Sequence, residues 1–310
     1  MMIRPRPVIA VTGAGGQLGR ELMRTRWDDG VQVCGYSSAE LDICNPDAVA
    51  AVLETLQPSI VVNAAAYTAV DQAEDEPELA EAVNATAVKT LAQASNRVGA
   101  MLVQVSTDYV FDGSKSGWYN ESDPIAPLGV YGRTKAAGEQ AADEAAKLVV
   151  LRTSWVYGAL GSNFVTTMLR LAGERNEIGV VADQLGCPTA AGALARAIVA
   201  LARATDHGAE PPSRRLYHLA GPDALSRHGF ADAVFACSQR GFDGTLRPLT
   251  TNEYPTKATR PANSRLDSSL IAHELGIVMP SFEMSVADVV IELESMAAKD
   301  RGGEENRPPG

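Results

Sequence analysis

Short apolar runs alternate with longer stretches of helix-forming residues through the first half of the chain. The runs cover residues 8–11, 31–36, 60–63, 101–105 and 148–152. Each has the length and apolar character of a strand that is buried on both faces. Because strand and helix alternate throughout, the pattern predicts an α/β fold with a doubly wound parallel sheet.

Three of the predicted helices have recognisable ends. Asn45 is expected to cap a helix that has Pro46 at its first position. A longer helix is expected over residues 77–98, and Gly99 ends it. Another opens at Tyr131, where strong helix formers follow.

The second half of the chain is less regular. Helices are expected at residues 163–172, 192–204, 226–240 and 281–297, separated by short strands and loops. We therefore predict a larger domain over residues 1–160, to which later segments return, and a smaller α/β domain over residues 161–298. Residues 299–310 are charged and rich in Gly and Pro, which predicts a disordered tail.

Composition narrows the class of protein. The 310 residues are 45% apolar, with a mean hydropathy of −0.06, as in a soluble globular protein. The 27 Lys and Arg against 38 Asp and Glu give a net charge of −11, which argues against broad binding of nucleic acid or an anionic membrane. No apolar run is long enough for a membrane span, so none is expected, and residues 1–7 lead us to expect no signal segment.

The four cysteines are scattered along the chain, at Cys34, Cys44, Cys187 and Cys237. They form no Cys-x-x-Cys pair, so neither a zinc site nor a disulfide framework is expected. This pattern fits a protein of the reducing cytoplasm.

A glycine-rich loop follows the first predicted strand. Gly13, Gly16 and Gly19 lie between this strand and a helix. Glycines in this context allow a tight turn and close approach of a pyrophosphate, which the helix N-terminus attracts. The spacing differs from the commoner Gly-x-Gly-x-x-Gly, and a plain glycine-rich turn is the alternative. We predict that residues 1–160 form a Rossmann-like NAD(P)-binding domain.

The end of the second predicted strand bears on the choice of cofactor. An acidic residue there would bind the ribose 2′-hydroxyl of NAD. The chain instead has Gly35, Tyr36, Ser37 and Ser38 at this point. A 2′-phosphate is therefore permitted and NADPH is expected, with NADH possible, although no arginine on this loop is an obvious partner for the phosphate.

Small or hydroxyl-bearing residues end the third and fourth predicted strands. Residues 64–66 are alanines, and Ser106 and Thr107 end the fourth strand; Trp155 follows the fifth. Since carboxyl ends of parallel strands meet at one edge, these residues are expected beside the glycine loop, where such sheets bind ligands. For the alanines, packing of a helix on the sheet is an equally good explanation.

Tyr131 and Lys135 are one turn apart on a predicted helix. A phenol beside an ammonium group can exchange a proton with a carbonyl or an alcohol, because the cation lowers the tyrosine pKa. This spacing also occurs by chance on exposed helices. The glycine loop and Thr107 favour the catalytic interpretation.

Positive side chains gather in residues 240–265. They are Arg240, Arg247, Lys257, Arg260 and Arg265. In an acidic protein this segment is a candidate site for a phosphorylated substrate. A solvated loop is an equally good explanation.

These motifs together resemble the extended short-chain dehydrogenase/reductase family, and in finer detail its dTDP-4-dehydrorhamnose reductases. The finer matches are residues 64–71, 105–111, 129–135, 152–157, 183–189 and 260–266. The resemblance covers about residues 8–290. It implies NAD(P)H-dependent reduction of the 4-keto group of dTDP-4-dehydro-L-rhamnose to dTDP-L-rhamnose, the last step of dTDP-rhamnose synthesis.

The resemblance also implies roles for individual residues. Thr107 would donate a hydrogen bond to the substrate carbonyl, Tyr131 would supply the proton, and Lys135 would bind the nicotinamide ribose. Trp155 would form an apolar wall against the sugar and, with Asp108, Tyr109 and Arg265, bind the substrate, Arg265 at the diphosphate. The cofactor-binding residues are expected to be Gly13, Gly16, Gln17, Leu18, Gly19, Asp42, Ile43, Ala64, Ala65, Ala66, Tyr67, Ser106, Tyr131, Lys135 and Trp155.

Some members of this family have a glutamate-lined magnesium site at a dimer interface. Glu21 and Glu283 match two of its carboxylates, but the third position falls at Gly192. A hard cation needs several oxygen ligands, so we expect neither the magnesium ion nor a dimer bridged by it. The protein could be a monomer or a homodimer that is not bridged by magnesium.

Three other functions are known or conceivable for a chain with these motifs. Relatives that dehydrate nucleotide sugars carry Asp-Glu after the catalytic threonine, whereas Tyr109 follows Asp108 here, which disfavours elimination. A reductase of another 4-keto nucleotide sugar, for example one giving 6-deoxy-L-talose, is an open alternative. So is a non-catalytic nucleotide-binding regulatory subunit, against which the intact set of Thr107, Tyr131 and Lys135 argues.

Overall fold

Six parallel strands form one central sheet, in the order β10-β5-β4-β3-β1-β2. The computed structural model describes residues 7–206 and 216–305. The strands are β1 (Val8–Thr12), β2 (Gln32–Tyr36), β3 (Ile60–Asn63), β4 (Met101–Thr107), β5 (Leu148–Thr153) and β10 (Leu216–His218). The predicted doubly wound α/β sheet is confirmed. Strand β10 comes from the second half of the chain and completes the edge beside β5.

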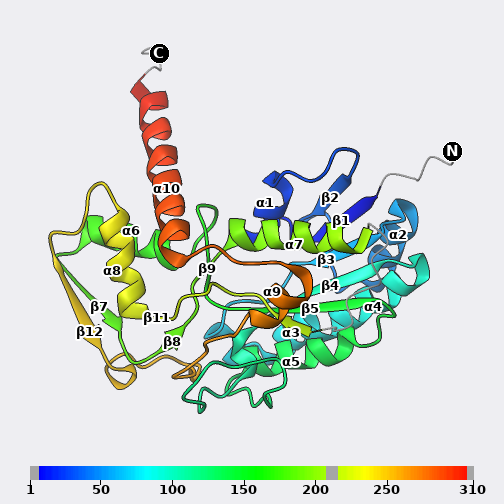
Figure 1. The fold of residues 1–310 in the computed structure, drawn as a ribbon, viewed down its shortest axis with the longest axis horizontal. Helices are drawn as coiled ribbons and strands as arrows, with labels where there is room; N and C mark the ends of the chain where they lie inside the picture. Colours follow the sequence, from blue (N-terminus) through cyan, green and yellow to red (C-terminus); the bar gives the residue numbers. More distant parts are fainter. Residues whose placement is uncertain (1–6, 207–215, 306–310) are drawn as a thin grey trace.

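Helices cover both faces of this sheet (Figure 1). Helices α1 (Gln17–Arg24) and α7 (Ala191–Asp206) share one core cluster with Ile9 and Val11 of β1. On the other face, α2 (Pro46–Leu56) and α4 (Ala87–Val98) share a second cluster with Ala10. Successive side chains of a strand point to opposite faces, so both faces need apolar residues. The near-continuous apolar runs of the sequence follow from this.

The expected helix ends are present. Asn45 caps α2 by accepting hydrogen bonds from the backbone N–H groups of Asp47 and Ala48, both at 3.1 Å. The helix predicted over residues 77–98 consists of α3 (Pro77–Glu81), a π-helical turn (Ala82–Thr86) and α4. Gly99 ends α4 with φ of 70°, a conformation that favours glycine.

A smaller lobe beside the sheet is built mainly from the second half of the chain. Its elements include α6 (Phe164–Glu174), β7 (Glu177–Val181), α8 (Arg227–Cys237), β12 (Thr245–Leu249) and α10 (Phe282–Glu305). Strands β7 and β12 pair in parallel. Other elements of the second half are β6 (Val156–Tyr157), β8 (Leu185–Gly186), β9 (Thr189–Ala190), β11 (Leu225–Ser226) and α9 (Ser269–Leu275). All four helices predicted for this half are present.

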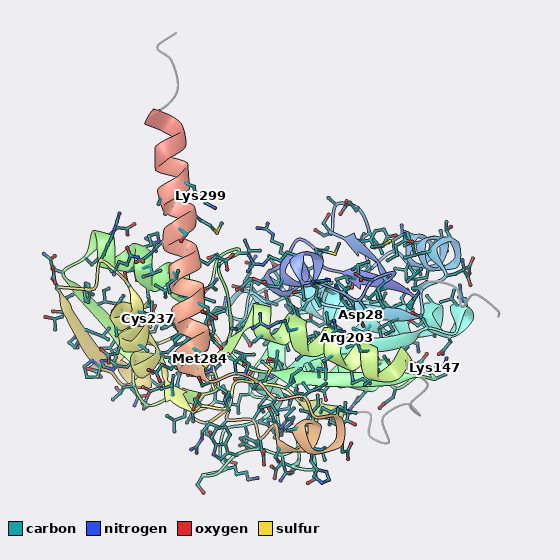
Figure 2. The ribbon with its side chains drawn as sticks, turned by 45° about the horizontal axis from the view of Figure 1, so that its top comes forward. Asp28, Lys147, Arg203, Cys237, Met284 and Lys299 are labelled. Atoms are coloured by element: carbon teal, nitrogen blue, oxygen red, sulfur yellow. The ribbon has the colours of Figure 1, made fainter. Side chains whose placement is uncertain are left out.

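Helix α10 is longer than the sequence predicts. The expected disordered tail begins at residue 299, but the helix continues through Glu305; residues 306–310 lie outside the described part. Extending an existing helix adds one hydrogen bond for each residue that is fixed, so charged residues can continue it. In Figure 1 this helix projects from the body of the molecule, and in Figure 2 Lys299 lies along the projecting part.

Among the helices of residues 7–206 and 216–305, none is long and apolar enough to cross a membrane. The four cysteines are free.

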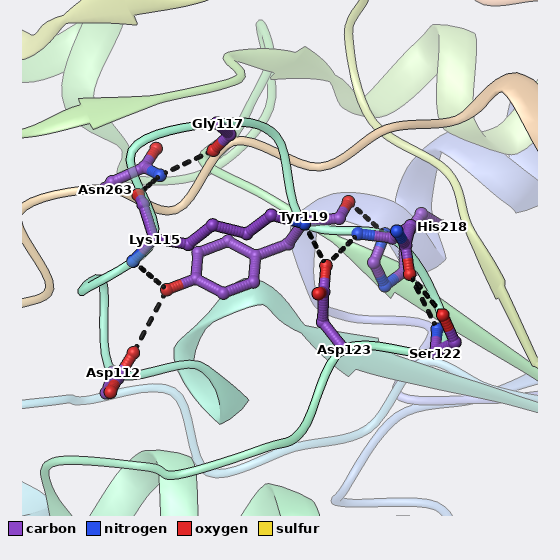
Figure 3. Close-up of polar contacts among 9 residues, drawn as sticks. Asp112, Lys115, Gly117, Tyr119, Ser122, Asp123, His218 and Asn263 are labelled. Carbon is purple, nitrogen blue, oxygen red and sulfur yellow. Dashed lines mark hydrogen bonds and ion pairs between the residues drawn. The ribbon is translucent and has the colours of Figure 1, made fainter.

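Strand β10 is anchored through His218 to the loop that follows β4 (Figure 3). The His218 ring nitrogen Nδ1 lies 3.1 Å from the carbonyl oxygen of Tyr119, and its backbone N–H donates to Glu121 at 2.8 Å. The ring packs edge-on to Phe111. Burial, reinforced by the positive charge of Arg152, lowers the pKa of His218 to about 3. This histidine is therefore neutral in the folded protein at physiological pH.

His218 should make the fold sensitive to acid. Its pKa is about 3 in the folded state and about 6.5 in the unfolded chain, so the unfolded state binds more protons as the pH falls below 6.5. Folding stability from this group is complete above pH 6.5 and is lost toward pH 3, at a rate approaching about 1.4 kcal/mol per pH unit. Urea unfolding of wild type and His218→Gln between pH 7 and 4.5 measures this difference.

The matched control is His273→Gln, which changes an exposed histidine of α9 and should keep the wild-type pH dependence. Equal pH slopes for wild type and His218→Gln would contradict the prediction.

Candidate active site

A cavity of about 470 Å³ lies at the carboxyl ends of β1, β3, β4 and β5. The sheet order reverses here, since β2 and β3 lie on opposite sides of β1, and such switch points are where doubly wound sheets bind ligands. The predicted site residues that line it are Gly16, Gln17, Leu18, Ala64, Ala65, Ala66, Ser106, Thr107, Asp108, Tyr109, Tyr131, Lys135 and Trp155. The convergence expected from the sequence is therefore present.

Gly13 and Gly19 do not line the cavity, but their close backbone contacts determine the shape of the loop. Gly13 has φ of 71°, and a Cβ atom there would lie 2.5 Å from the backbone nitrogen of Ala65. A Cβ atom at Gly19 would clash with the carbonyl oxygen of Gly13. The loop after β1 is thus packed against the alanines after β3, and α1 starts at the cavity. The first backbone N–H groups of a helix suit a phosphate.

Arg20 is a cation beside the glycine loop, near the end of β2, that the sequence analysis did not identify as a candidate for the cofactor site. Arg20 donates from Nε to the carbonyl oxygen of Gly15 at 2.8 Å, and a Cβ atom at Gly15 would lie 3.5 Å from Cβ of Ser37. Glu40, also nearby, accepts hydrogen bonds from the backbone N–H and hydroxyl of Ser37. Arg20 comes from α1, not from the loop after β2, so proximity along the sequence did not reveal it.

Asn84, in the π-helical turn, fixes one wall of the cavity. Its side chain accepts from the backbone N–H of Tyr67 at 2.9 Å and donates to the Tyr67 carbonyl and the Thr134 hydroxyl, both at 3.1 Å. A Cβ atom at Gly138 of α5 (Val130–Ala142) would clash with the Asn84 carbonyl oxygen. These contacts hold the segment after β3 against the helix that carries Tyr131.

Thr107 and Asp108 form a buried polar pair at the end of β4. The Thr107 hydroxyl donates to Asp108 Oδ1 at 3.0 Å, and the Ser154 hydroxyl donates to Oδ2 at 2.8 Å. Burial raises the pKa of Asp108, and these hydrogen bonds oppose the rise. The Thr107 hydroxyl also hydrogen-bonds with the phenol of Tyr131, and the charge of Asp108 acts on the same phenol.

The expected lowering of the Tyr131 pKa by Lys135 is not observed. Burial raises the pKa of Tyr131; the hydrogen bond with Thr107 opposes the rise, and the charges of Asp108 and Tyr109 add to it. A phenolate in a partly enclosed site loses water contacts, which outweighs the hydrogen bond. In the protein alone, Tyr131 is thus a neutral phenol that keeps its proton at neutral pH.

Lys135 is buried one turn after Tyr131 on α5, and its pKa is lowered. Its ammonium donates to the carbonyl oxygen of Val105 at 2.7 Å. Burial lowers the pKa of Lys135 to about 8, while the charge of Glu139 opposes this. Glu139 is in turn held by the Ser106 hydroxyl at 2.5 Å and by two bonds from Arg152 at 2.8 and 2.6 Å. Lys135 therefore carries most of a positive charge at pH 7.

Two cavity arginines come from the second half of the chain. Arg260 donates to the Tyr109 hydroxyl at 3.0 Å and to Asp71 at 2.6 Å. Arg227 also lines the cavity and interacts with Tyr109. The basic segment of the sequence included Arg260, whereas Arg227 is an isolated arginine that no local pattern marks.

Arg265 is not among the residues that line the cavity. It donates from Nε to Asn263 at 2.7 Å and from Nη2 to the Ser116 carbonyl at 2.5 Å. These bonds hold its guanidinium at the loop that precedes Trp118. Its phosphate-binding role stays a prediction from the resemblance.

Three further predicted cofactor residues also lie outside the cavity lining. Asp42 accepts a hydrogen bond from the backbone N–H of Cys44 at 2.9 Å, and Ile43 is part of the core. The Tyr67 hydroxyl donates to Glu76 at 2.6 Å. Their expected contacts with a cofactor stay predictions.

The residues expected near a magnesium site do not fit a metal. Glu283 is not among the residues that line the hollow around Glu21, whereas Glu292 is. The Arg24 guanidinium lies between the two carboxylates: it donates to Glu21 at 2.6 and 2.7 Å and to Glu292 at 3.0 Å. Gly192 faces Glu21 without a ligand atom. In residues 7–206 and 216–305, no group of three His, Cys, Asp or Glu is placed to hold a metal.

The chain is similar over almost its whole length to known reductases. A family model described as RmlD substrate binding domain matches residues 7–295. The dTDP-4-dehydrorhamnose reductase of Aggregatibacter actinomycetemcomitans is 43% identical over 287 residues, which cover 91% of this chain and 97% of the relative.

Solved structures agree with this similarity. A dTDP-4-dehydrorhamnose reductase from Clostridium acetobutylicum ATCC 824 superposes with a TM-score of 0.86 at 36% identity, covering 93% of this chain and 99% of that one. The dTDP-4-dehydrorhamnose reductase from Bacillus anthracis strain Ames, solved in complex with NADP, gives 0.85 at 37% identity with the same coverage.

The arginine between Glu21 and Glu292 should stabilise the fold without a metal. Arg24→Ala leaves the buried Glu21 carboxylate without its cation and should lower the free energy of unfolding by about 1–3 kcal/mol. Arg170→Ala, which removes an exposed ion pair with Glu174, should cost less than about 0.5 kcal/mol. Urea unfolding with Mg²⁺ and with EDTA should give equal values for the wild type. A loss of stability in EDTA would contradict this account.

Proposed function

The chain belongs to the family described as RmlD substrate binding domain, and from this membership we propose that it reduces the 4-keto group of dTDP-4-dehydro-L-rhamnose with NADPH, giving dTDP-L-rhamnose. It is an NAD(P)H-dependent oxidoreductase with an extended short-chain dehydrogenase/reductase fold. One observation carries the proposal: Thr107, Tyr131 and Lys135 meet in a cavity that the glycine loop also lines.

The cofactor would lie across the switch point of the sheet. The N-terminus of α1, with Gln17 and Leu18 at the cavity, suits its pyrophosphate. Arg20, beside the glycine loop and the end of β2, would bind the 2′-phosphate that distinguishes NADPH from NADH. When bound, the cofactor supplies a hydride to the carbonyl carbon.

Tyr131 would donate the proton that completes the alcohol. Its raised pKa keeps the phenol protonated at neutral pH, as a proton donor requires. Thr107 hydrogen-bonds with Tyr131 and Asp108, which supports its role in orienting the substrate oxygen. The positive charge of Lys135 would stabilise the phenolate that remains and hold the ribose hydroxyl groups of the cofactor.

The substrate diphosphate would be bound by Arg227 and Arg260. Both guanidinium groups line the cavity and approach Tyr109, and guanidinium groups match the geometry of phosphate oxygens. Tyr109 also packs edge-on to Tyr131, with ring centroids 5.5 Å apart. Recognition of the phosphates would thus be linked through one side chain to the proton donor.

The compartment and the assembly belong to the proposal as well. Four free cysteines fit a reducing cytoplasm. The binding partner is the nucleotide-sugar substrate, and a monomer and a homodimer are both compatible with the site.

Replacing the proton donor should abolish turnover without loss of cofactor. Tyr131→Phe removes the phenolic proton and should lower kcat by about 100-fold or more, while the Kd for NADPH changes by less than about threefold. NADPH oxidation with the dTDP-linked 4-keto sugar and fluorescence titration with NADPH give the two values. Tyr254→Phe, at a tyrosine that is 56% exposed, is the control. Full turnover by Tyr131→Phe, or none by the wild type, would refute the proposal.

Arg20 should determine the preference for NADPH. Arg20→Ala removes a cation for the 2′-phosphate and should raise KM for NADPH by about tenfold, leaving KM for NADH unchanged. Arg26→Ala, whose side chain is 90% exposed, should change neither value. An equal rise with both cofactors would assign Arg20 a structural role instead.

A further inference from the structure

Trp155 has an unusual backbone conformation at the cavity. Its φ is 46°, in the left-handed region that residues other than glycine rarely adopt. Such a conformation persists only where the surroundings enforce it, and it is concentrated at functional sites. Two neighbours, Gly186 and Arg227, lie against its indole ring.

Gly186 makes room for the indole ring. A Cβ atom at Gly186 would lie 2.6 Å from Nε1 of Trp155 and would clash with further ring atoms. Any side chain larger than hydrogen would therefore displace the ring. Gly186 belongs to β8, which pairs with β11 immediately before Arg227 in the chain.

The Arg227 guanidinium stacks on the indole ring, with 3.6 Å between Cζ and the ring centroid. Within the described residues, no carboxylate forms an ion pair with Arg227. Its charged neighbours are Asp108, whose carboxylate is already bonded to Thr107 and Ser154, and a second cation, Arg260. A half-buried guanidinium group next to another cation favours the binding of an anion.

We infer that Trp155 is a positioning residue that, wedged beside Gly186, holds the Arg227 guanidinium in the cavity for the diphosphate of the nucleotide-sugar substrate. This inference rests on the proposed function. Arg227 lies over the Trp155 ring, and the apolar wall against the sugar that the resemblance implies stays a prediction.

Stacking of this kind prepares the guanidinium for its ligand. A free arginine side chain has many rotamers, and ordering them opposes binding. A cation on an aromatic face is stabilised without using its N–H donors, so the donors that do not bond Tyr109 stay available for phosphate oxygens. Loss of the aromatic face should therefore weaken diphosphate binding without changing the chemical step.

A double-mutant cycle on dTDP binding tests the inference. The variants are Trp155→Leu, Arg227→Met and the double variant, with the Kd for dTDP measured by calorimetry. Each single change should raise Kd by about tenfold or more, and the double variant should be little worse than Arg227→Met, because Trp155 acts through Arg227. Independent, multiplying effects, or an unchanged Kd in Arg227→Met, would overturn the inference.

Conservative variants separate positioning from folding. Trp155→Phe keeps an aromatic face and should restore most of the dTDP affinity lost in Trp155→Leu. Gly186→Ala should raise the Kd for dTDP and the KM for the 4-keto sugar with kcat within about twofold. Gly173→Ala, where a Cβ atom meets nothing within 4 Å, is the matched control. If Trp155→Phe binds dTDP as weakly as Trp155→Leu, the stacking argument fails.

Failure of the inference and failure of the proposed function are distinguishable. If the wild type binds dTDP and the double-mutant cycle gives the expected result, but the wild type does not reduce the 4-keto sugar, the proposed function is refuted. The inference about Trp155 and Arg227 then still holds. If the wild type reduces the 4-keto sugar but the two substitutions have independent effects on the Kd for dTDP, the proposed function stands and the inference is refuted. Wild type that does not bind dTDP overturns the inference whatever its activity.

Discussion

The close contact between two backbone loops sets the geometry of the whole site. Gly13 after β1 and Ala65 after β3 approach so closely that no side chain fits between them. Because β1 and β3 are neighbours at the point where the sheet order reverses, this contact leaves the N-terminus of α1 at the cavity. The positions available to a dinucleotide, and therefore to the sugar opposite it, follow from this one constraint.

Burial then decides the protonation of the groups that do the chemistry. The same enclosure raises the pKa of Tyr131 and lowers that of Lys135, so the tyrosine keeps its proton while the lysine can still carry charge. Below them, the pair of Glu139 and Arg152 is buried with its bonds largely satisfied. The site is thus supported by an ion pair whose two charges neutralise each other, as buried ions require.

Helix α1 links this site to the second half of the chain. Its first residues line the cavity, and Arg24 at its end binds Glu292 of α10. A guanidinium group makes directional bonds to two carboxylates at once, so it joins the helices without an added cation. The second half of the chain contributes Arg227 and Arg260 to the cavity lining, and Gly186, which packs against Trp155.

The sequence alone determined the parts that depend on local pattern. Apolar runs predicted the strands because both faces of the sheet are buried. The glycine loop and Thr107 were found because parallel strands end at one edge, and Tyr131 and Lys135 because they are one turn apart on a helix. Tertiary structure decided what depends on contacts between distant residues. Arg227 stacks on Trp155, and Arg24 joins Glu21 to Glu292. The direction of the Tyr131 pKa shift depends on enclosure by segments far apart in the chain. Spacing along a sequence records which residues share a helix face or follow a strand, but not how deeply a group is buried or which distant charge it meets.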